Sequence, residues 1–299
     1  MILVLWSVIL GGLLSCPYLT TSVQLPVILW HGMGDSCYHA GIQELVNLIR
    51  DVGLQVQCIS TGKGELQDLE DTYFKPIDQQ INQVCDELLA DPMMSEGVHM
   101  IGLSQGGLFV RALAQRCPFK RLGSIISIGG PQMGVFGVPK CRDMGPIFLC
   151  SMMEKILSYA AYSDFAQKHL VQAQYWNNPF EMDQFYAKCH FLTDINQELR
   201  VNETYRLNLR RVKALVLVRF MQDTVLVPHI SEWFGFYDRN STTSVHTMKE
   251  TILYTEDRLG LKELEKSNRL HLLQVDDDHL RFTREWFMKI IQQFLMDSP

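Results

Sequence analysis

Short apolar runs alternate with longer amphipathic stretches over most of the chain. Six apolar runs predict strands, at residues 26–30, 55–60, 98–103, 123–128, 213–220 and 270–275. Strands that are covered on both faces read as nearly continuous apolar runs, and helices between them supply the cover. The pattern therefore predicts an α/β fold with a mostly parallel central sheet and helices on both sides.

Two amphipathic stretches predict helices, and one long segment shows no regular pattern. Apolar positions at three- and four-residue spacing predict a helix over 105–116 and a final helix from about 283 to 296. Between 131 and 211 the alternation lapses, and the segment is rich in Met, Phe, Tyr and Trp. With neither repeat nor linker in the sequence, we expect a single domain over 24–299 that carries a largely helical insertion at about 131–211.

Composition narrows the possible partners. The 299 residues are 47% hydrophobic, which is enough for a substantial core. The net charge of -6 and the lack of a long basic run argue against nucleic acid or an anionic membrane surface as the main partner. After the amino-terminal segment, the sequence has no apolar stretch that predicts a stable membrane span.

The amino-terminal segment resembles a secretory signal. Residues 2–14 are apolar, small polar residues follow, and cleavage is expected before about Gln24, so that residues 1–23 form a signal peptide. A buried first strand or an anchor is the alternative. If the chain is secreted, the sequons at Asn202 and Asn240 predict glycosylation at both asparagines.

The cysteines also suit an oxidising compartment. Eight are present, and loss of Cys16 with the signal would leave seven, so at least one must stay unpaired or bond elsewhere. Cys85 lies on the apolar face of an expected helix and could reach Cys117, at the end of the helix over 105–116. Cys141 and Cys150 would close a short loop. Buried free thiols are the alternative for both pairs.

One pentapeptide carries the strongest chemical signal. Gly102-Leu103-Ser104-Gln105-Gly106 directly follows an apolar run and opens the predicted helix. A serine on a sharp turn from strand to helix exposes its hydroxyl as a nucleophile, whereas a chance match would lack that context. A serine hydroxyl needs an imidazole to accept its proton and a carboxylate to orient the imidazole. The remainder of the chain should supply both.

Asp223 and His279 occupy the expected places. His279 follows the last predicted strand and precedes the final helix, and Asp223 follows the strand at 213–220. Both should emerge with Ser104 at the carboxyl edge of the sheet, in the order Ser, Asp, His. His31 and His99 are better interpreted as structural. Other acids in the interval have no comparable strand before them and suit turns or the surface: Asp194, Asp238 and Asp257.

Two backbone amides are candidates for the oxyanion hole. Gln105 begins the helix after the nucleophile, so its N–H can point at a developing oxyanion. Met33 lies in the glycine-rich loop after the first strand and could supply the second N–H, although a plain tight turn would read the same. The sequence lacks zinc-ligand spacing and a complete phosphate-loop motif, so neither a metal nor a cofactor is expected.

Several segments together resemble one family. They are Trp30-His31-Gly32-Met33-Gly34-Asp35-Ser36-Cys37, Gly102-Leu103-Ser104-Gln105-Gly106-Gly107 and Glu232-Trp233-Phe234-Gly235-Phe236-Tyr237. From about Leu25 to Leu295 the chain is similar to palmitoyl-protein thioesterases. The resemblance implies a lysosomal α/β hydrolase that removes long-chain acyl groups from the cysteines of S-palmitoylated proteins or peptides.

The resemblance also assigns residues. The nucleophile, acid and base of the family fall on Ser104, Asp223 and His279, and its oxyanion donors fall on Met33 and Gln105. Its two disulfides fall on Cys85–Cys117 and Cys141–Cys150. The chain departs from the family where two adjacent cysteines are expected, because Cys37 is followed by Tyr38. The pairing of Cys37, Cys58 and Cys189 therefore stays open.

An apolar groove for the acyl chain is implied as well. Trp176, Phe180, Phe191 and Trp233 could line it, or could be ordinary core. The triad alone does not select thioesters, so a secreted lipid oxyesterase is an alternative, and a catalytically silent binding protein is a further one. The acidic run at 276–278 would raise the pKa of the His279 imidazole if its carboxylates lay close, or could simply be solvated.

Overall fold

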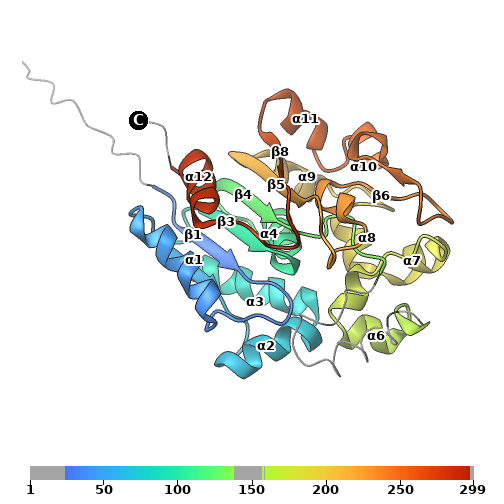
Figure 1. Cartoon of the computed structure of the whole chain (residues 1–299), viewed down its shortest axis with the longest axis horizontal. Helices are drawn as coiled ribbons and strands as arrows, with labels where there is room; N and C mark the ends of the chain where they lie inside the picture. The colour runs from blue at the N-terminus through green and yellow to red at the C-terminus, as the bar shows by residue number, and fades with distance from the viewer. Residues whose placement is uncertain (1–23, 138–156, 158, 297–299) are drawn as a thin grey trace, which may run out of the picture.

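The computed structural model describes residues 24–137, 157 and 159–296. Its centre is a six-stranded parallel sheet in the order β2-β1-β3-β4-β5-β8 (Figure 1). The strands are β1 (Val27–Trp30), β2 (Val56–Ile59), β3 (Val98–Leu103), β4 (Leu122–Ile128), β5 (Ala214–Phe220) and β8 (Leu270–Val275). All six predicted strands are confirmed, each end within one residue. The expected signal peptide, Cys141 and Cys150 lie outside the described residues.

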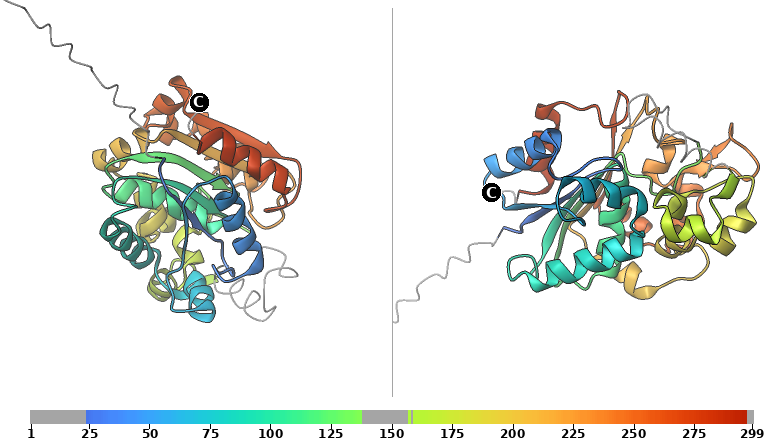
Figure 2. Two further views of the ribbon diagram at one scale, coloured as in Figure 1. Left: turned by 90° about the vertical axis from the view of Figure 1, so that its left-hand side faces the viewer. Right: turned by 90° about the horizontal axis from the view of Figure 1, so that it is seen from below.

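Side-chain alternation along the strands divides the core into two layers. In β1, Val27 and Leu29 face one layer, whereas Ile28 and Trp30 face the other. The first layer is covered by α1 (Ala40–Asp51) and α12 (Arg284–Phe294), and the second by α3 (Ile77–Ala90) and α4 (Gln105–Arg116). Figure 2 shows these helices on opposite faces of the sheet. The α/β fold with helices on both sides is therefore confirmed.

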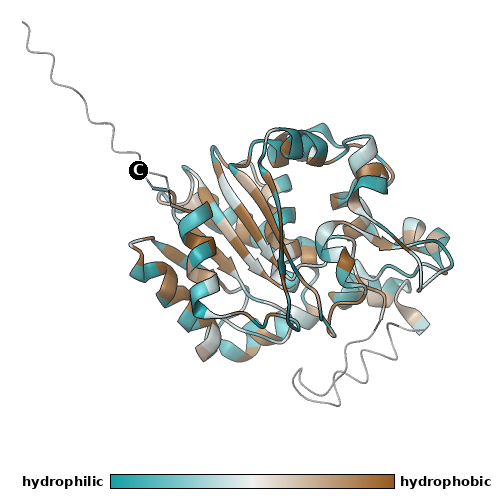
Figure 3. Cartoon of the chain, turned by 45° about the horizontal axis from the view of Figure 1, so that its top comes forward, coloured by the Kyte–Doolittle hydropathy of each residue, from teal (hydrophilic) through white to brown (hydrophobic). Residues whose placement is uncertain are grey.

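Figure 3 shows where hydrophobic positions gather. They follow the strands and the sides of the helices that pack on them, while hydrophilic positions lie on the outer helix surfaces. In α12, Phe287 and Ile291 are fully buried against the sheet. Helices whose apolar residues recur every three or four positions bury one face in this way, which is what the sequence pattern predicted.

A largely helical segment follows β4. Its elements are α6 (Asp164–His169), η1 (Gln172–Tyr175), α7 (Met182–Lys188), α8 (His190–Ile195) and α9 (Glu203–Arg210). In Figure 1, α6, α7 and α8 lie together beyond one end of the sheet. In contrast α9 packs on α4, and Asn208 Nδ2 of α9 donates to Gln115 O at 2.9 Å. Helix α9 lies within the expected insertion at 131–211, but it belongs with the helices that cover the sheet.

A buried arginine joins this segment to α4. Arg111 is fully buried, and burial lowers its pKa to about 9. Its guanidinium donates to Gln132 Oε1 at 2.5 Å, Asn196 Oδ1 at 2.7 Å and Ile195 O at 3.1 Å. A buried cation is tolerated only when its donors are satisfied, so these bonds fix the end of α8 against the sheet layer.

The chain leaves the sheet again between β5 and β8. This part contains η2 (His229–Trp233), the antiparallel pair β6 (Phe236–Tyr237) and β7 (Val245–His246), η3 (Met248–Glu250), α10 (Ile252–Thr255) and α11 (Leu261–Lys266). The sequence pattern did not predict these elements because each is too short to show a period. Among the described residues, no helix has the length and apolar character needed to cross a membrane.

Within the described residues, two disulfides join elements in the amino-terminal half of the chain. Cys85–Cys117 joins α3 to the end of α4, with a Cα–Cα distance of 5.6 Å. Cys37–Cys58 joins the loop after β1 to β2, at 5.8 Å, and resolves the pairing of two cysteines that the sequence left open. Cys189 is a buried free thiol, and burial raises its pKa to about 12.

Candidate active site

Ser104 lies on a strained turn between β3 and α4. Its φ of 51° and ψ of -125° are unusual for a residue with a side chain, and its N–H donates to Ile128 O at 2.8 Å. The flanking glycines are required by space. A Cβ on Gly102 would lie 2.2 Å from Gly106 O, and a Cβ on Gly106 would lie 2.3 Å from Trp30 O. The turn therefore needs glycine at both positions to present the serine.

The structure brings Ser104, His279 and Asp223 together. His279 Nε2 lies 2.9 Å from Ser104 Oγ, and His279 Nδ1 lies 2.5 Å from Asp223 Oδ2. The Asp223 side chain is fully buried and that of His279 is 9% exposed. A proton on Nδ1 directed at Asp223 leaves Nε2 able to accept the serine proton.

Asp223 is held as a carboxylate. Burial raises its pKa, but the hydrogen bond and charge of His279 and a hydrogen bond from Glu232 outweigh burial, so the net pKa is lowered. Asp223 Oδ1 also accepts the N–H groups of Val225 and Leu226, at 2.8 and 2.7 Å. The carboxylate is thus fixed in charge and in orientation.

The acidic run links the two loops that carry Asp223 and His279. Asp278 Oδ1 accepts the backbone N–H groups of Thr224 and His279, both at 2.8 Å. Asp276 Oδ1 accepts from Gln222 Nε2 at 3.1 Å. These bonds tie the loop after β5 to the loop after β8. Asp276 and Asp278 have a positioning role that the sequence did not indicate, since it suggested only an effect on the His279 pKa or solvation.

The loop after β1 passes directly beside the nucleophile. A Cβ on Gly32 would lie 3.0 Å from Ser104 Cβ, which is a tight contact, so glycine lets the loop approach the serine closely. Met33 follows in a turn and is half-buried. Gly34, at φ 72°, donates its N–H to Thr72 Oγ1 at 2.9 Å. The loop therefore places the Met33 backbone near Ser104.

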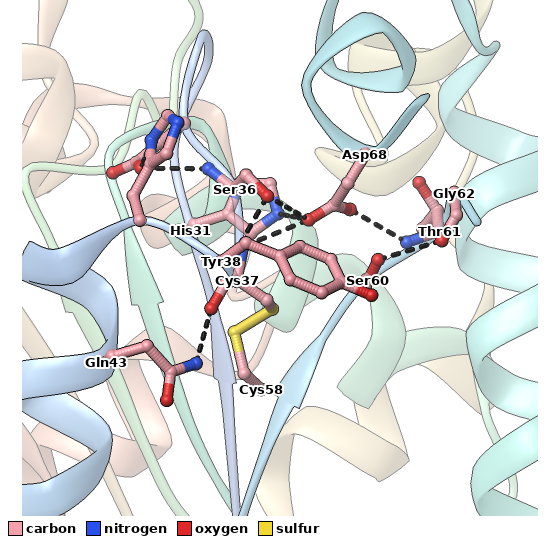
Figure 4. Close-up of a disulfide and its surroundings, with 12 residues drawn as sticks. His31, Ser36, Cys37, Tyr38, Gln43, Cys58, Ser60, Thr61, Gly62 and Asp68 are labelled. Atoms are coloured by element: carbon pink, nitrogen blue, oxygen red, sulfur yellow. Dashed lines mark hydrogen bonds and ion pairs between the residues drawn. A yellow bond between two sulfur atoms is a disulfide. The ribbon is translucent and has the colours of Figure 1, made fainter. Parts of the chain in front are cut away.

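Asp68 of α2 (Glu65–Phe74) holds this loop (Figure 4). Its Oδ2 accepts from Ser36 Oγ and Cys37 N–H, both at 3.0 Å, and lies 3.2 Å from His31 Nε2. Its Oδ1 accepts from Thr61 N–H at 3.1 Å. Burial raises the pKa of Asp68, but the His31 hydrogen bond and charge and further hydrogen bonds lower it to about 2. The Cys37–Cys58 disulfide fixes the same loop from below.

Gln105 begins α4, where helix N–H groups have no acceptor within the helix. Its side chain is buried and fully engaged. Gln105 Oε1 accepts from Tyr175 Oη at 2.9 Å and from Gln172 Nε2 at 3.1 Å, and its Nε2 donates to Thr72 O at 3.1 Å. The start of α4 is thereby anchored both to α2 and to η1.

The four aromatic candidates for the acyl groove lie in different surroundings. Trp176 is 3% exposed and packs on Phe136, with ring centroids 5.4 Å apart; Phe136 also packs on Phe180, at 5.9 Å. Phe180 is 52% exposed. Phe191 instead packs on Phe109 in the core beneath α4. Trp233 is half-buried, and its Nε1 donates to Leu217 O at 3.0 Å.

Three residues of this region were missed by the sequence reasoning. Asp68 and Glu232 are buried carboxyls, and Phe136 links two of the predicted aromatics. Ligand atoms of Asp223, Glu232 and His279 lie within 4.8 Å of one another, as do those of His31, Cys37 and Asp68. A hydrogen bond joins His279 to Asp223 in the first group, and Cys37 of the second is in a disulfide. A periodic sequence pattern carries no signal for such buried polar groups.

The parallel sheet, the serine on its turn and the order Ser, Asp, His define an α/β hydrolase. The family model for palmitoyl protein thioesterase matches residues 26–279. The chain belongs to this family.

Relatives share sequence over most of the chain. Palmitoyl-protein thioesterase 1 of Caenorhabditis elegans is 39% identical over 277 residues, which cover 91% of this chain and 92% of the relative. Palmitoyl-protein thioesterase 3 of Dictyostelium discoideum is 34% identical, covering 83% of each chain. The human lysosomal thioesterase PPT2 is 32% identical, covering 84% of this chain and 80% of the relative.

Proposed function

We propose that this protein is a serine hydrolase that removes long-chain acyl groups, such as palmitate, from cysteine thioesters in proteins or peptides. One observation carries the proposal: the hydrogen-bonded chain from Ser104 through His279 to Asp223, in a member of this family. The relatives named above are thioesterases by name.

The reaction proceeds through an acyl-serine. Ser104 Oγ attacks the thioester carbonyl carbon while its proton passes to His279 Nε2. The carbon–sulfur bond then breaks, and the cysteine sulfur leaves with the proton from His279. A water molecule next gives a proton to His279 and attacks the acyl-serine carbonyl. Palmitate is released, and the Ser104 hydroxyl recovers its proton.

The backbone N–H groups of Met33 and Gln105 are the donors for the oxyanion in this proposal. Supporting evidence comes from their placement, since one lies in the loop beside Ser104 and the other begins α4. Asp68 and the Cys37–Cys58 disulfide hold the loop, and the Gln105 side chain anchors the helix start. Donors that are fixed before reaction stabilise the developing charge without reorganising.

The acyl chain is assigned to the aromatic row of Phe136, Trp176 and Phe180. The row is joined to the active-site loop, because the Phe136 N–H donates to Val227 O at 2.7 Å, four residues after Asp223. The exposed edge of Phe180 gives a long chain an apolar surface to lie on. Phe191 and Trp233 are left out of the row because one packs in the core and the other bonds to β5.

A lysosomal location is also proposed. The human, mouse and rat relatives named PPT2 are called lysosomal thioesterases. Of the two sequon asparagines, Asn240 is exposed beside β6, and Asn202 Oδ1 caps α9 by accepting the Thr204 N–H at 3.0 Å. Glycosylation at both sites would be detected as a loss of mass on treatment with an N-glycosidase.

The test compares two substrates that differ at one atom. A peptide with S-palmitoyl-cysteine and its O-palmitoyl-serine counterpart are hydrolysed by wild-type enzyme and by the Ser104→Ala variant. The proposal predicts a higher kcat/KM for the thioester and loss of both activities in the variant. A preference for the oxyester would favour the alternative of a lipid oxyesterase and contradict the proposed substrate class.

A further inference from the structure

We propose that Glu232 is a positioning residue of the active site, whose neutral carboxylic acid donates a hydrogen bond to Asp223 and keeps the triad acid ionised and in place. This role rests on the proposed function for its kinetic consequence. Its physical basis is the contact between two buried carboxyls, which can be tested independently of the substrate.

The environment of Glu232 leaves one of its oxygens directed at Asp223. Glu232 is the last but one residue of η2 and is 1% exposed. Its Oε2 accepts the Phe220 N–H at 2.7 Å, at the end of β5. Its Oε1 is buried, and no N–H or O–H donor within the described part of the chain reaches it. The Glu232 and Asp223 carboxyls approach each other, with an oxygen of each within 4.8 Å of the other, so the hydrogen-bonding partner that remains is the carboxyl of Asp223.

Two carboxyls in such contact cannot both ionise, so one must carry a proton. The charged form of Asp223 receives three donors, namely His279 Nδ1 and the N–H groups of Val225 and Leu226. Glu232 receives one, from Phe220. Asp223 is therefore the carboxyl whose anion is better stabilised by hydrogen bonds. The proton belongs on Glu232 Oε1, from which it forms the hydrogen bond to Asp223.

The other charged groups nearby do not change this assignment. Burial, then the hydrogen bond with Asp223 and the charge of Asp223, raise the pKa of Glu232 to about 11. Arg219 of β5 lowers it, but by less. The Arg219 Nε donates to His229 Nδ1 of η2 at 3.1 Å, and its guanidinium lies 5.2 Å from the centre of the Trp233 ring. The contacts of the Arg219 guanidinium are thus with His229 and Trp233.

Because Glu232 is neutral, the Glu232 and Asp223 carboxyls together carry one negative charge instead of two. Its hydrogen bond lowers the pKa of Asp223, so that Asp223 stays ionised in acid and keeps orienting His279. Without the donor, Asp223 would take up a proton at higher pH. The acidic limb of the rate profile would then move to higher pH.

The variants Glu232→Gln and Glu232→Leu test whether the active site needs a hydrogen-bond donor at position 232 or a negative charge there. Glutamine keeps an acceptor for the Phe220 N–H and an N–H donor for Asp223, whereas leucine fills space and offers neither. The profile of kcat/KM against pH is measured with S-palmitoyl-cysteine peptide and with a small activated ester. Glu198→Gln is the matched control, because Glu198 is a carboxyl in the helical segment with a pKa raised to about 7 by burial and no contact with the triad.

We expect Glu232→Gln to keep the wild-type acidic limb, and Glu232→Leu to lose about 10- to 100-fold in kcat with that limb moved to higher pH. Equal losses in both variants would mean that an ionised Glu232 is required, and unshifted profiles in both would leave it a purely structural role. Either result overturns the proposal. The activated ester reports the limb even if the thioester is not the substrate.

A spectroscopic measurement keeps the proposal testable if Glu232→Leu does not fold. The infrared difference between folded wild type and Glu232→Gln at neutral pH should contain the carbonyl stretch of a protonated carboxylic acid. Its absence would show that Glu232 is ionised, whatever the enzyme hydrolyses. Failure to hydrolyse the thioester with the band present would instead count only against the proposed function.

Discussion

Replacing Glu232 by glutamine should stabilise the protein increasingly as the pH rises. Glu232 is buried, and its pKa is raised from 4.5 to about 11. The folded protein therefore holds a proton that the unfolded chain releases above pH 4.5. The stability that this proton contributes is fully present below about pH 4.5 and is lost as the pH rises toward 11.

The size of the effect follows from linkage. Each pH unit above the unfolded pKa lowers the free energy of unfolding of the wild type by about 1.4 kcal/mol relative to Glu232→Gln, which has no such proton. From pH 5 to pH 7 the difference grows by about 3 kcal/mol. The slope does not depend on the exact raised pKa, provided that this pKa exceeds the assay range.

Urea denaturation of both proteins at pH 5, 6, 7 and 8 measures the difference. The part of the difference in unfolding free energy that does not change with pH measures how well the amide fits the site. The slope of that difference with pH measures the proton that Glu232 holds in the folded protein. Glu70→Gln serves as the control, because Glu70 is exposed on α2 and its replacement should give a difference that is nearly flat with pH. A flat difference for Glu232→Gln as well would contradict this prediction, because it would mean that Glu232 ionises in the folded protein.

Three further outcomes are expected. Asp223→Asn should lower kcat by about 10⁴-fold in steady-state assays while the fold persists, since the amide favours the wrong His279 tautomer; a loss below tenfold would contradict this. Asp68→Asn should lower the free energy of unfolding by about 2 kcal/mol in urea denaturation. Because the pKa of Asp68 is lowered to about 2, the stability that its carboxylate contributes to the wild type should persist down to about pH 4 and fade only in stronger acid. An unchanged midpoint would contradict the role of Asp68 in holding the loop after β1. Trp176→Ala should alter the dependence of kcat/KM on acyl length, whereas Phe191→Ala should mainly lower the unfolding midpoint; the reverse pattern would remove Trp176 from the acyl site.

The elements that the sequence predicted well are those with a strong local signal. The six strands appear as apolar runs because both faces of each are covered, and Ser104 is marked by glycines that a crowded turn demands. The two-residue strands β6 and β7 were missed, since two residues are too few for any period.

Burial of polar groups was not predictable, because it depends on neighbours distant in sequence. Asp68 and Glu232 look like ordinary acids in the chain. Tertiary contacts make Asp68 a carboxylate held by hydrogen bonds and make Glu232 a neutral acid. Cys37 and Cys58 likewise pair only because the loop after β1 lies beside β2. Phe191 and Trp176 are both apolar aromatics, and only their packing separates a core position from the aromatic row.

Trapping the acyl group on the enzyme tests the role of Ser104 as the nucleophile. Wild-type protein is quenched in acid during turnover of an S-palmitoyl-cysteine peptide, digested and analysed by mass spectrometry, with Ser104→Ala as the control. We expect one palmitoyl group on the fragment that contains Ser104, and neither the adduct nor hydrolysis in the variant. Palmitoylation at another residue, or continued thioester hydrolysis by Ser104→Ala, would contradict it.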